Sequence, residues 1–531
     1  MFQMPVSKEA ARVRRIALGD GVHRSALLHG NRLAVVDGAV RMTYAELNAA
    51  SSQFAHYLLA ALPAGAHVAM LCANSADMLV AINGIHKAGA VWVPTNYLLA
   101  PSQIDYILRH AEASAIVADE EMCQRPEMTE MLARLNLPVI VTRPHGAAGA
   151  GSRHGATLAQ AIQGRPKTLP DVEIETDQPA IIMYTSGTTG HPKGVVHSHG
   201  SAYHGASANL VSFGFSEADV LTCMLPLFHV GQHCVTLSGS LIGACVVMFR
   251  GFSPEEVIRQ IQSERITVTV GLPMMYAGIL AHPSAGAADF SSLRLCVYAM
   301  APMPARLIGQ IADKMSRNIM LATGQTEIYP VTMSFRPLDH PGREANYWGV
   351  SKSACETAIM DDDGHLLPPG QVGEIVHRGA NTMLGYFKDP EATAAVQKFG
   401  WHHTGDLGMV DEGGQMLFLD RKKDMIKTGG ENVPSIKVEA VLLGHPAVGG
   451  VAVIGVPHPH WSEAICAVVV LKPGADGTPE SLKAHCRQML GSFEVPKAIK
   501  IVDALPMTAT GKVQKQILRA QFSGMFAEGD Q

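Results

Sequence analysis

Cysteine, net charge and long apolar runs are all scarce in this sequence. Its 9 cysteines are spread over 531 residues without a CxxC pair, which argues against a disulfide framework and a structural zinc site. Lys and Arg number 42 against 47 Asp and Glu, a formal charge of -5, so no overall basic field recruits nucleic acid. No uninterrupted apolar run reaches the ~20 residues of a membrane-spanning helix, and residues 1–20 lack the apolar stretch of a secretory signal. We therefore expect a cytoplasmic protein with no membrane span and no nucleic-acid partner.

What the sequence does contain is the composition of a large folded protein. Hydrophobic residues make up 47% of the chain and charged residues 17%, which excludes a mainly disordered protein. At ~150 residues per domain, the chain has room for roughly three domains or lobes. The first ~420 residues alternate short β-branched runs with amphipathic stretches, a pattern that predicts parallel α/β layers.

One βαβ unit is well marked within that part. Residues 245–249 (CVVMF) and 267–271 (TVTVG) are typical of buried strands. Between them, Ser253 stands at an N-cap, Pro254 at the first helical position and Glu256 at the capping-box position. The helix that follows is a crossover, so the two strands are predicted to be parallel.

The residue pattern of the sequence changes after residue 420. Residues 420–424 (DRKKD) form a charge-dense break, which could be only a solvated face. A mixed α+β pattern follows it, so a domain boundary is the favoured interpretation. We expect helices near residues 435–443 and 479–490, and strands near residues 450–456 and 464–471.

Residues 184–194 (YTSGTTGHPKG) are the most specific segment. They combine glycines, hydroxyl side chains and Lys193 directly after the strand-like run at residues 180–184. Such a loop suits a phosphate chain, because glycines let backbone N–H groups approach, hydroxyls donate and the lysine adds a cation. Open α/β sheets bind ligands at this position, just past the carboxyl end of a strand. The loop does not fit the Walker A pattern, since its glycines precede Lys193 at other spacings.

Histidines gather just after this loop, at spacings that can bind a metal. They are His197, His199, His204, His229 and His233. No carboxylate partner recurs at helical spacing, so pocket lining or surface exposure is favoured over a metal site for most of them.

The loop at residues 184–194 resembles the signature of the adenylate-forming superfamily, which includes acyl-CoA synthetases, peptide-synthetase adenylation domains and beetle luciferases. The resemblance continues in order along nearly the whole chain and points to the acyl-CoA synthetase, or carboxylate–CoA ligase, branch. The other matching segments are residues 43–47, 87–91, 226–229, 299–302, 323–327, 373–374, 404–406, 420–439 and 506–515.

This resemblance implies a fold and a reaction. The fold is α/β, with a large multi-lobed N-terminal domain of α/β layers (residues 1–420) and a small mobile α+β C-terminal domain (residues 421–531). A hinge near residues 420–424, with Lys423 as its pivot, is implied between them. In the reaction a carboxylate and Mg-ATP give an acyl-adenylate and pyrophosphate, and the thiol of CoA then takes the acyl group. ATP and CoA are the expected substrates, Mg²⁺ is the expected metal, and a homodimer is left open.

The resemblance also assigns the contacts to ATP and AMP. They are Thr185, Ser186, Gly187, Thr188, Thr189, Gly190, Lys193, Thr323, Gly324, Gln325, Thr326, Asp406 and Arg421. Asp406 can accept both ribose hydroxyls, and Arg421 can donate to the same sugar. Thr323 stands where the family usually has an adenine-stacking tyrosine, and Tyr298 is a neighbouring aromatic side chain.

Catalytic roles are implied for Lys193, His229, Glu327 and Lys512. A carboxylate that attacks the α-phosphorus brings two anions together, so catalysis needs positioning and charge neutralisation. Lys193 can hold the leaving pyrophosphate, and Glu327 is a hard oxygen ligand suited to Mg²⁺. Lys512 is expected to reach the carboxylate and the α-phosphate. Each residue has a structural alternative, such as a helix-start carboxylate for Glu327 and a core histidine for His229.

The resemblance also implies which residues line the two substrate pockets. The acyl pocket is expected at His229, Gly231, Tyr298, Ala299 and Gly324, and the CoA channel at Gly429 and Gly430. The nearby Met, Tyr and small residues predict an apolar, adaptable pocket. We expect a fatty acid of medium or longer chain as the substrate, with an aryl or cinnamate-type acid as the alternative. A stand-alone adenylation protein that loads a carrier protein, a luciferase-like oxygenase and an inactive nucleotide sensor are the other functions considered.

Overall fold

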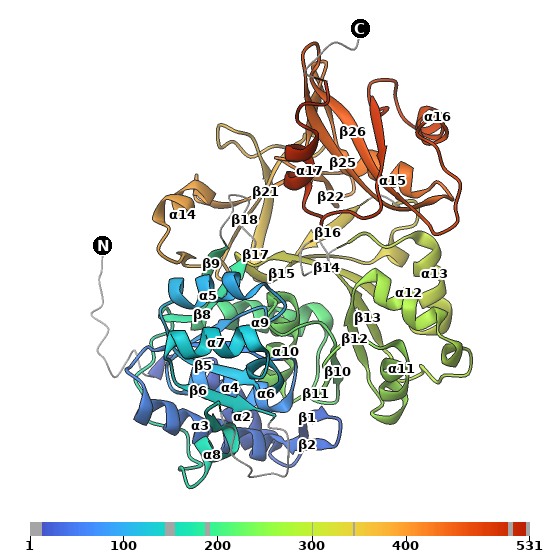
Figure 1. The fold of residues 1–531 in the computed structure, drawn as a ribbon. Helices are drawn as coiled ribbons and strands as arrows, with labels where there is room; N and C mark the ends of the chain where they lie inside the picture. The colour runs from blue at the N-terminus through green and yellow to red at the C-terminus, as the bar shows by residue number, and fades with distance from the viewer. Residues whose placement is uncertain are drawn as a thin grey trace. The chain divides into compact units, whose positions relative to one another are not determined.

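The computed structural model describes residues 13–143, 154–185, 192–299, 301–343, 346–507 and 513–526 (Figure 1). The chain divides into two compact units. The first comprises Met1–Thr357 and His377–His402, and the second comprises Ala358–Val376 and His403–Gln531. Helices and strands alternate through the first unit and mix in the second, which confirms the predicted fold class. Among the described residues, no helix is long and apolar enough to cross a membrane.

One sheet of the first unit carries the segment predicted to bind phosphate. Its strand order is β19-β9-β8-β4-β3-β5-β6-β7. The strands are β3 (His67–Leu71), β4 (Val91–Pro94), β5 (Ala113–Asp119), β6 (Val139–Thr142), β7 (Ala156–Thr157), β8 (Pro179–Thr185), β9 (Lys193–Ser198) and β19 (Gly385–Tyr386). The strands from β8 to β7 run parallel, whereas β9 is antiparallel to both β8 and β19.

The second sheet of this unit has the order β2-β1-β11-β10-β12-β13-β14-β15-β16. The strands are β1 (Leu33–Asp37), β2 (Val40–Thr43), β10 (Val220–Cys223), β11 (Cys245–Met248), β12 (Val268–Gly271), β13 (Leu295–Tyr298), β14 (Ile319–Gln325), β15 (Ile328–Phe335) and β16 (Tyr347–Ser351). The crossover predicted from residues 245–271 is confirmed, since α11 (Pro254–Ser263) begins after Ser253, whose side chain caps Glu256. Both strands are parallel to β10, which lies between them.

Helices cover both faces of each sheet in the first unit (Figure 1). One buried core packs α3 (Tyr44–Ala61), α4 (Ala76–Lys87), α9 (His199–Phe213) and α10 (Val230–Ile242) between the two sheets. The outer cores pack α5 (Pro101–His110) and α7 (Pro126–Leu135) on one sheet, and α11, α12 (Pro273–Ala281) and α13 (Ala305–Lys314) on the other. Strands covered on both faces are apolar throughout, and every residue of β4 is accordingly buried.

The second unit is built around a long hairpin. Its β25 (Val448–His458) and β26 (Ser462–Leu471) are paired over their whole length, and β23 (Ile426–Thr428) and β27 (Ala498–Ile501) flank β26. The helices α15 (Ser435–Leu443) and α16 (Pro479–Met489) pack on one face of the hairpin, and α17 (Lys515–Phe522) on the other. The two predicted helices and two predicted strands of this region are confirmed.

Earlier segments of the chain also belong to the second unit. Residues 358–376 and 403–420 are part of it, so the boundary runs within β17 (Cys355–Met360), β18 (Gly373–Gly379) and β21 (Trp401–Val410). The hinge expected near residues 420–424 lies inside the second unit, where it starts at the end of β22 (Met416–Arg421), and stays a prediction.

Candidate functional site

The hairpin formed by β8 and β9 opens at the segment predicted to bind phosphate. Thr185 and Lys193 lie opposite each other in the antiparallel register and are its last described pair. The predicted ligands between them lie outside the described residues, and they are Ser186, Gly187, Thr188, Thr189 and Gly190. Gly194 has a packing role, because a Cβ there would lie 2.9 Å from Ile182 Cγ2 and 3.3 Å from Phe387 Cβ.

Lys193 lies beside a tyrosine and a carboxylate in the first unit. Its Nζ is 5.0 Å from the centroid of the Tyr386 ring and 3.8 Å from Oδ2 of Asp389. A cation over an aromatic face is held by the ring quadrupole. The Tyr386 hydroxyl donates to Oε1 of Glu327 at 2.9 Å. Tyr386 thus brings together the cation and the carboxylate that the sequence predicts as functional.

Glu327 lies in a tight turn between β14 and β15. Gln325 and Ile328 pair across this turn, and the carbonyl of Glu327 accepts the backbone N–H of Met383 at 2.8 Å. Burial raises the pKa of Tyr386, and the nearby Glu327 carboxylate raises it further. The phenol therefore stays protonated at neutral pH and acts as the donor.

The residues of this turn fit a hard divalent cation. Glu327 is half-buried, and among the described residues only one of its carboxylate oxygens accepts a hydrogen bond. The other oxygen is a hard ligand of the kind that Mg²⁺ prefers. This oxygen could hold Mg²⁺, and the role of Glu327 as its ligand stays a prediction.

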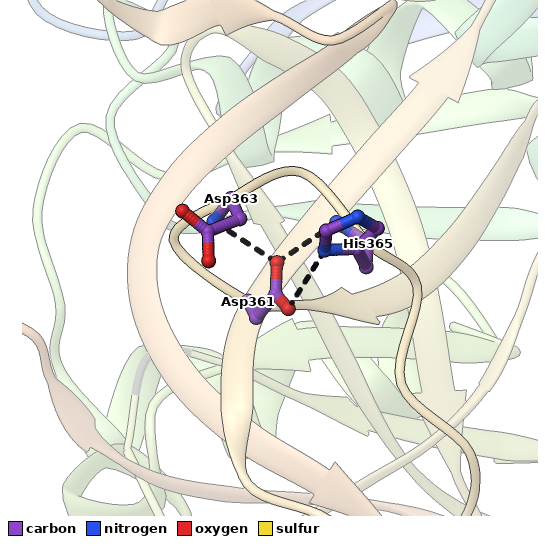
Figure 2. Close-up of side chains that lie close together, drawn as sticks. All are labelled: Asp361, Asp363 and His365. Carbon is purple, nitrogen blue, oxygen red and sulfur yellow. Dashed lines mark hydrogen bonds and ion pairs between the residues drawn. The ribbon is translucent and has the colours of Figure 1, made fainter.

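In the described part of the chain, one group of His, Asp and Glu side chains lies close enough together to hold a metal ion, and Glu327 is not in it. It consists of Asp361, Asp363 and His365 in the second unit (Figure 2). Asp361 accepts the backbone N–H groups of Asp363 and His365 at 3.0 and 2.8 Å, and its other oxygen lies 3.2 Å from the His365 ring. These contacts are those of an Asx-type turn, which accounts for the cluster without a metal. None of the clustered histidines of residues 197–233 belongs to this group.

Packing constrains the residues of β14 that are predicted to contact the nucleotide. Thr323 lies opposite Met333, and its hydroxyl donates to the Met333 carbonyl at 3.4 Å. At Gly324 a Cβ would lie 2.5 Å from Cβ of Pro330, so a side chain there would require the turn to shift. The glycine is explained by this close approach as well as by the predicted pocket.

Besides Gly324 on β14, the predicted acyl-pocket residues lie at the ends of two elements, β13 and α10. Tyr298 ends β13 and is buried, and burial raises its pKa to about 12. Ala299 follows it and donates its N–H to the Gly271 carbonyl at 3.3 Å. His229 is the N-cap of α10, with its ring centroid 4.5 Å from that of Phe228. Gly231, in the first turn of α10, is exposed to open space.

In the second unit, Asp406 and Arg421 face each other across β21 and β22. Arg421 Nε lies 3.9 Å from Asp406 Oδ1, and only 10% of the Asp406 side chain is exposed. Glu374 supports this pair, because its carboxylate accepts the N–H of Gly405 at 2.9 Å. Burial alone would raise the pKa of Glu374, but this bond and the His403 ring outweigh burial and lower it. Strand register thus joins the two residues predicted to bind ribose.

The remaining residues predicted to be functional in the C-terminal part of the chain are Lys423, Gly429, Gly430 and Lys512. Lys423 is exposed just after β22. Gly429 and Gly430 form the turn between β23 and β24 (Glu431–Val433), with φ values of 60° and 88°, which glycine adopts without strain. Gly429 donates its N–H to the Trp461 carbonyl at 3.0 Å. Lys512 lies outside the described residues.

Tyr386 is the residue of this site that reasoning from the sequence missed. It stands on the two-residue strand β19, which pairs with β9 and places Tyr386 opposite Val195. So short a strand has no usable periodicity. The aromatic pair Tyr386-Phe387 after Gly385 is the one local signal, and it does not specify a partner.

We expect Tyr386→Phe to slow adenylate formation by roughly 10- to 150-fold. The substitution keeps the ring beside Lys193 but removes the hydrogen bond to Glu327, and such bonds to charged groups contribute ~1.5–3 kcal/mol. The measurement is single-turnover pyrophosphate release, with the melting temperature recorded in parallel. Tyr203→Phe on α9, at a half-buried tyrosine, is the matched control. An unchanged rate in Tyr386→Phe would contradict the role of the hydroxyl.

Comparisons with known proteins agree with this geometry. The AMP-binding enzyme family matches residues 22–387, and the AMP-binding enzyme C-terminal domain matches residues 437–512. The chain is 35% identical to a feruloyl-CoA synthase of Amycolatopsis sp, over 96% of this chain and 100% of that protein. It is 32% identical to the long-chain-fatty-acid–CoA ligase FadD13 of Mycobacterium tuberculosis, over 91% and 94%.

A solved structure supports the same assignment over the full length. ATP-bound MatB from Rhodopseudomonas palustris superimposes with a TM-score of 0.84 at 28% identity, over 96% of this chain and 99% of that one. The family matches together span most of the chain, in the order that the sequence motifs predict. The chain therefore belongs to the adenylate-forming family of AMP-binding enzymes, as an AMP-forming acid–thiol ligase of the carboxylate–CoA ligase branch.

Proposed function

We propose that the protein joins a carboxylic acid to CoA in two steps. In the first, a carboxylate oxygen attacks the α-phosphorus of ATP, an acyl-adenylate forms and pyrophosphate leaves. In the second, the CoA thiol attacks the acyl carbon, the thioester forms, and AMP and a proton leave. The observation that carries this proposal is the Lys193–Tyr386–Glu327 arrangement at the predicted phosphate loop of a chain from this family.

The proposed roles follow from charge. Lys193 and the hydroxyl of Thr185 stand where the loop leaves the sheet, and they would hold the phosphates of ATP. Glu327 would be the ligand of Mg²⁺, which when bound neutralises phosphate oxygens. Neutralising charge at these oxygens is the main requirement of the first step, because two anions must meet.

Further roles are proposed in the second unit. Asp406 would accept the ribose hydroxyls, with Arg421 as a donor to the same sugar, because the two lie 3.9 Å apart on paired strands. Lys512 would serve the first step and Lys423 would be the hinge. Gly429 and Gly430 would admit the pantetheine arm of CoA, since a turn without side chains leaves room for it.

For the acid, we propose a fatty acid of medium or longer chain. Supporting this choice are the buried Tyr298, the open space at Gly231 and the similarity to FadD13, whose name specifies long-chain fatty acids. The second candidate is an aryl or cinnamate-type acid, which the similarity to feruloyl-CoA synthase favours.

A graded series of acids tests both the reaction and the substrate. The purified protein is given ATP, Mg²⁺ and either hexanoate, octanoate, laurate and palmitate, or benzoate, cinnamate and ferulate. Pyrophosphate is measured without CoA, and thioester with CoA. Each buried methylene contributes ~0.8 kcal/mol, so kcat/KM should rise about fourfold per added carbon until the pocket is full.

The outcomes separate the candidates. A rise along the fatty series supports the fatty-acid proposal, and a preference for cinnamate or ferulate supports the second candidate instead. Acyl transfer to a holo carrier protein but not to CoA would mean that the acceptor is a carrier protein and not CoA. Absence of pyrophosphate with every acid would contradict the proposed function.

A further inference from the structure

One of the clustered histidines contacts the turn that carries Glu327. His197 is on β9 and is fully buried. Its Nε2 lies 2.6 Å from the carbonyl oxygen of Thr326, and its Nδ1 lies 3.1 Å from Oγ of Ser201. Nε2 must carry the ring proton, because a carbonyl can only accept. Both ring nitrogens therefore have partners, and one of them is the residue before Glu327.

The same strand also carries Lys193. Alternate residues of a strand project from one face, so Lys193, Val195 and His197 share a face of β9. Tyr386 is directly opposite Val195 in the antiparallel register, and directly opposed residues also share a face. The cation, the phenol that binds Glu327 and the imidazole that binds Thr326 therefore lie on one face of a two-strand ribbon.

Two backbone hydrogen bonds also hold the turn, and their partners are not on β9. The carbonyl of Glu327 accepts from Met383, and the N–H of Tyr329 donates to the Asn381 carbonyl at 2.9 Å. Both anchors are in the segment that leads into β19. Among the described residues, His197 is the side chain that donates to the Thr326 carbonyl, and it is the link from β9 itself to this turn.

We propose that His197 is a positioning residue for adenylation, which sets the Glu327 carboxylate in place relative to Lys193. It acts through the Thr326 carbonyl and touches neither ATP nor the acid. This inference rests on the proposed function, because it assigns Lys193 and Glu327 to the first step. Substitution of His197 should therefore impair adenylate formation selectively.

The test compares His197→Leu, which fills the space without a donor, with His197→Gln, whose amide N–H can replace Nε2–H. Adenylate formation is followed as single-turnover pyrophosphate release. Thioester formation is followed from supplied acyl-adenylate and CoA. The Kd of Mg-ATP is measured by calorimetry in the absence of acid, as a readout that does not depend on turnover.

We expect His197→Leu to slow adenylation about tenfold, the effect of losing one buried hydrogen bond, and to weaken Mg-ATP binding. Thioester formation should stay within about twofold of the unmodified protein, and His197→Gln should restore most of the lost rate. The matched control is His377→Leu on β18. His377 is also buried, but its partner is Thr357, whose hydroxyl lies 2.9 Å from His377 Nδ1, and not a residue of the turn. This control should lower the melting temperature without changing the ratio of the two half-reactions.

Two results would overturn the inference. One is a His197→Leu variant in which both half-reactions fall equally, as they would from a loss of folded protein. The other is adenylation at the normal rate in that variant. Either result leaves the proposed function intact, provided that the unmodified protein releases pyrophosphate with an acid. If the unmodified protein releases none, it is the proposed function that fails.

Discussion

Lys512→Ala is expected to slow adenylate formation by roughly 10²–10³-fold, the loss typical of one preorganised donor at a developing charge. The same variant should convert supplied acyl-adenylate and CoA to thioester at a near-normal rate. The proposal assigns Lys512 to the first step, in which negative charge is most crowded. After pyrophosphate has left, the ammonium has no such task in thiol attack.

Two single-turnover assays on one variant make this test. The first follows pyrophosphate release from ATP and acid, and the second follows thioester formation from supplied adenylate. Lys500→Ala is the matched control, because Lys500 is an exposed lysine of the second unit on β27 with no proposed role. If the thioester half falls as far as the adenylation half, Lys512 is not specific to one step, and the proposal of a mobile domain loses its main support.

The fold should also lose stability steeply as the pH falls below 6.5. Burial lowers the pKa of His199 to about 4, and lowers those of His233 and His377 to about 3. The folded protein keeps these three side chains neutral, whereas the unfolded chain protonates each of them near pH 6.5. Their stabilising contribution is therefore complete above pH 6.5 and is lost as the pH falls toward 4.

The expected size follows from proton linkage. Each such histidine lowers the free energy of unfolding by about 1.4 kcal/mol per pH unit within this window. Three of them between pH 6.5 and 4.5 would remove about 8 kcal/mol, comparable with the ~5–15 kcal/mol of a typical fold. Asp77 and Glu439, whose pKa values burial raises, act in the opposite direction.

Urea denaturation at half-unit steps from pH 7.5 to 5 measures this effect. His377→Asn can keep a partner for the Thr357 hydroxyl, which lies 2.9 Å from Nδ1 of His377, and removes one titrating group. Its stability should depend less steeply on pH, by about 1.4 kcal/mol per unit. His204→Asn, at an exposed histidine of α9, should leave the slope unchanged. A flat profile for the unmodified protein between pH 7 and 5 would contradict the prediction.

Much of the local structure could be predicted from the sequence because its causes are local. The cap at Ser253 and the apolar runs on either side of α11 predict the crossover. The helix expected at residues 435–443 has the same bounds as α15. The strand before the glycine-rich loop is β8, and the return strand begins at Lys193. Periodicity and capping involve neighbours within a few residues, so one segment contains the information.

Sequence motifs likewise predicted the family, but they did not show why a given residue type is needed at each position of a motif. Gly324 resembles a pocket residue, yet its Cβ position is occupied by Pro330. Gly429 and Gly430 resemble a channel, and they form a turn with positive φ at both positions. A glycine in a motif can serve a ligand or the backbone, and only the surrounding atoms show what the backbone requires.

The sequence by itself determined the local elements, the class of fold, the order of the motifs and the predicted phosphate loop. Only the tertiary structure placed β10 between β11 and β12, Tyr386 beside both Lys193 and Glu327, and His197 against a carbonyl 129 residues further along the chain. These contacts depend on which strands become neighbours and in what register. Local periodicity indicates which face of a strand is buried but not which strand lies beside it, so the partners of the candidate site emerge only when the sheets assemble.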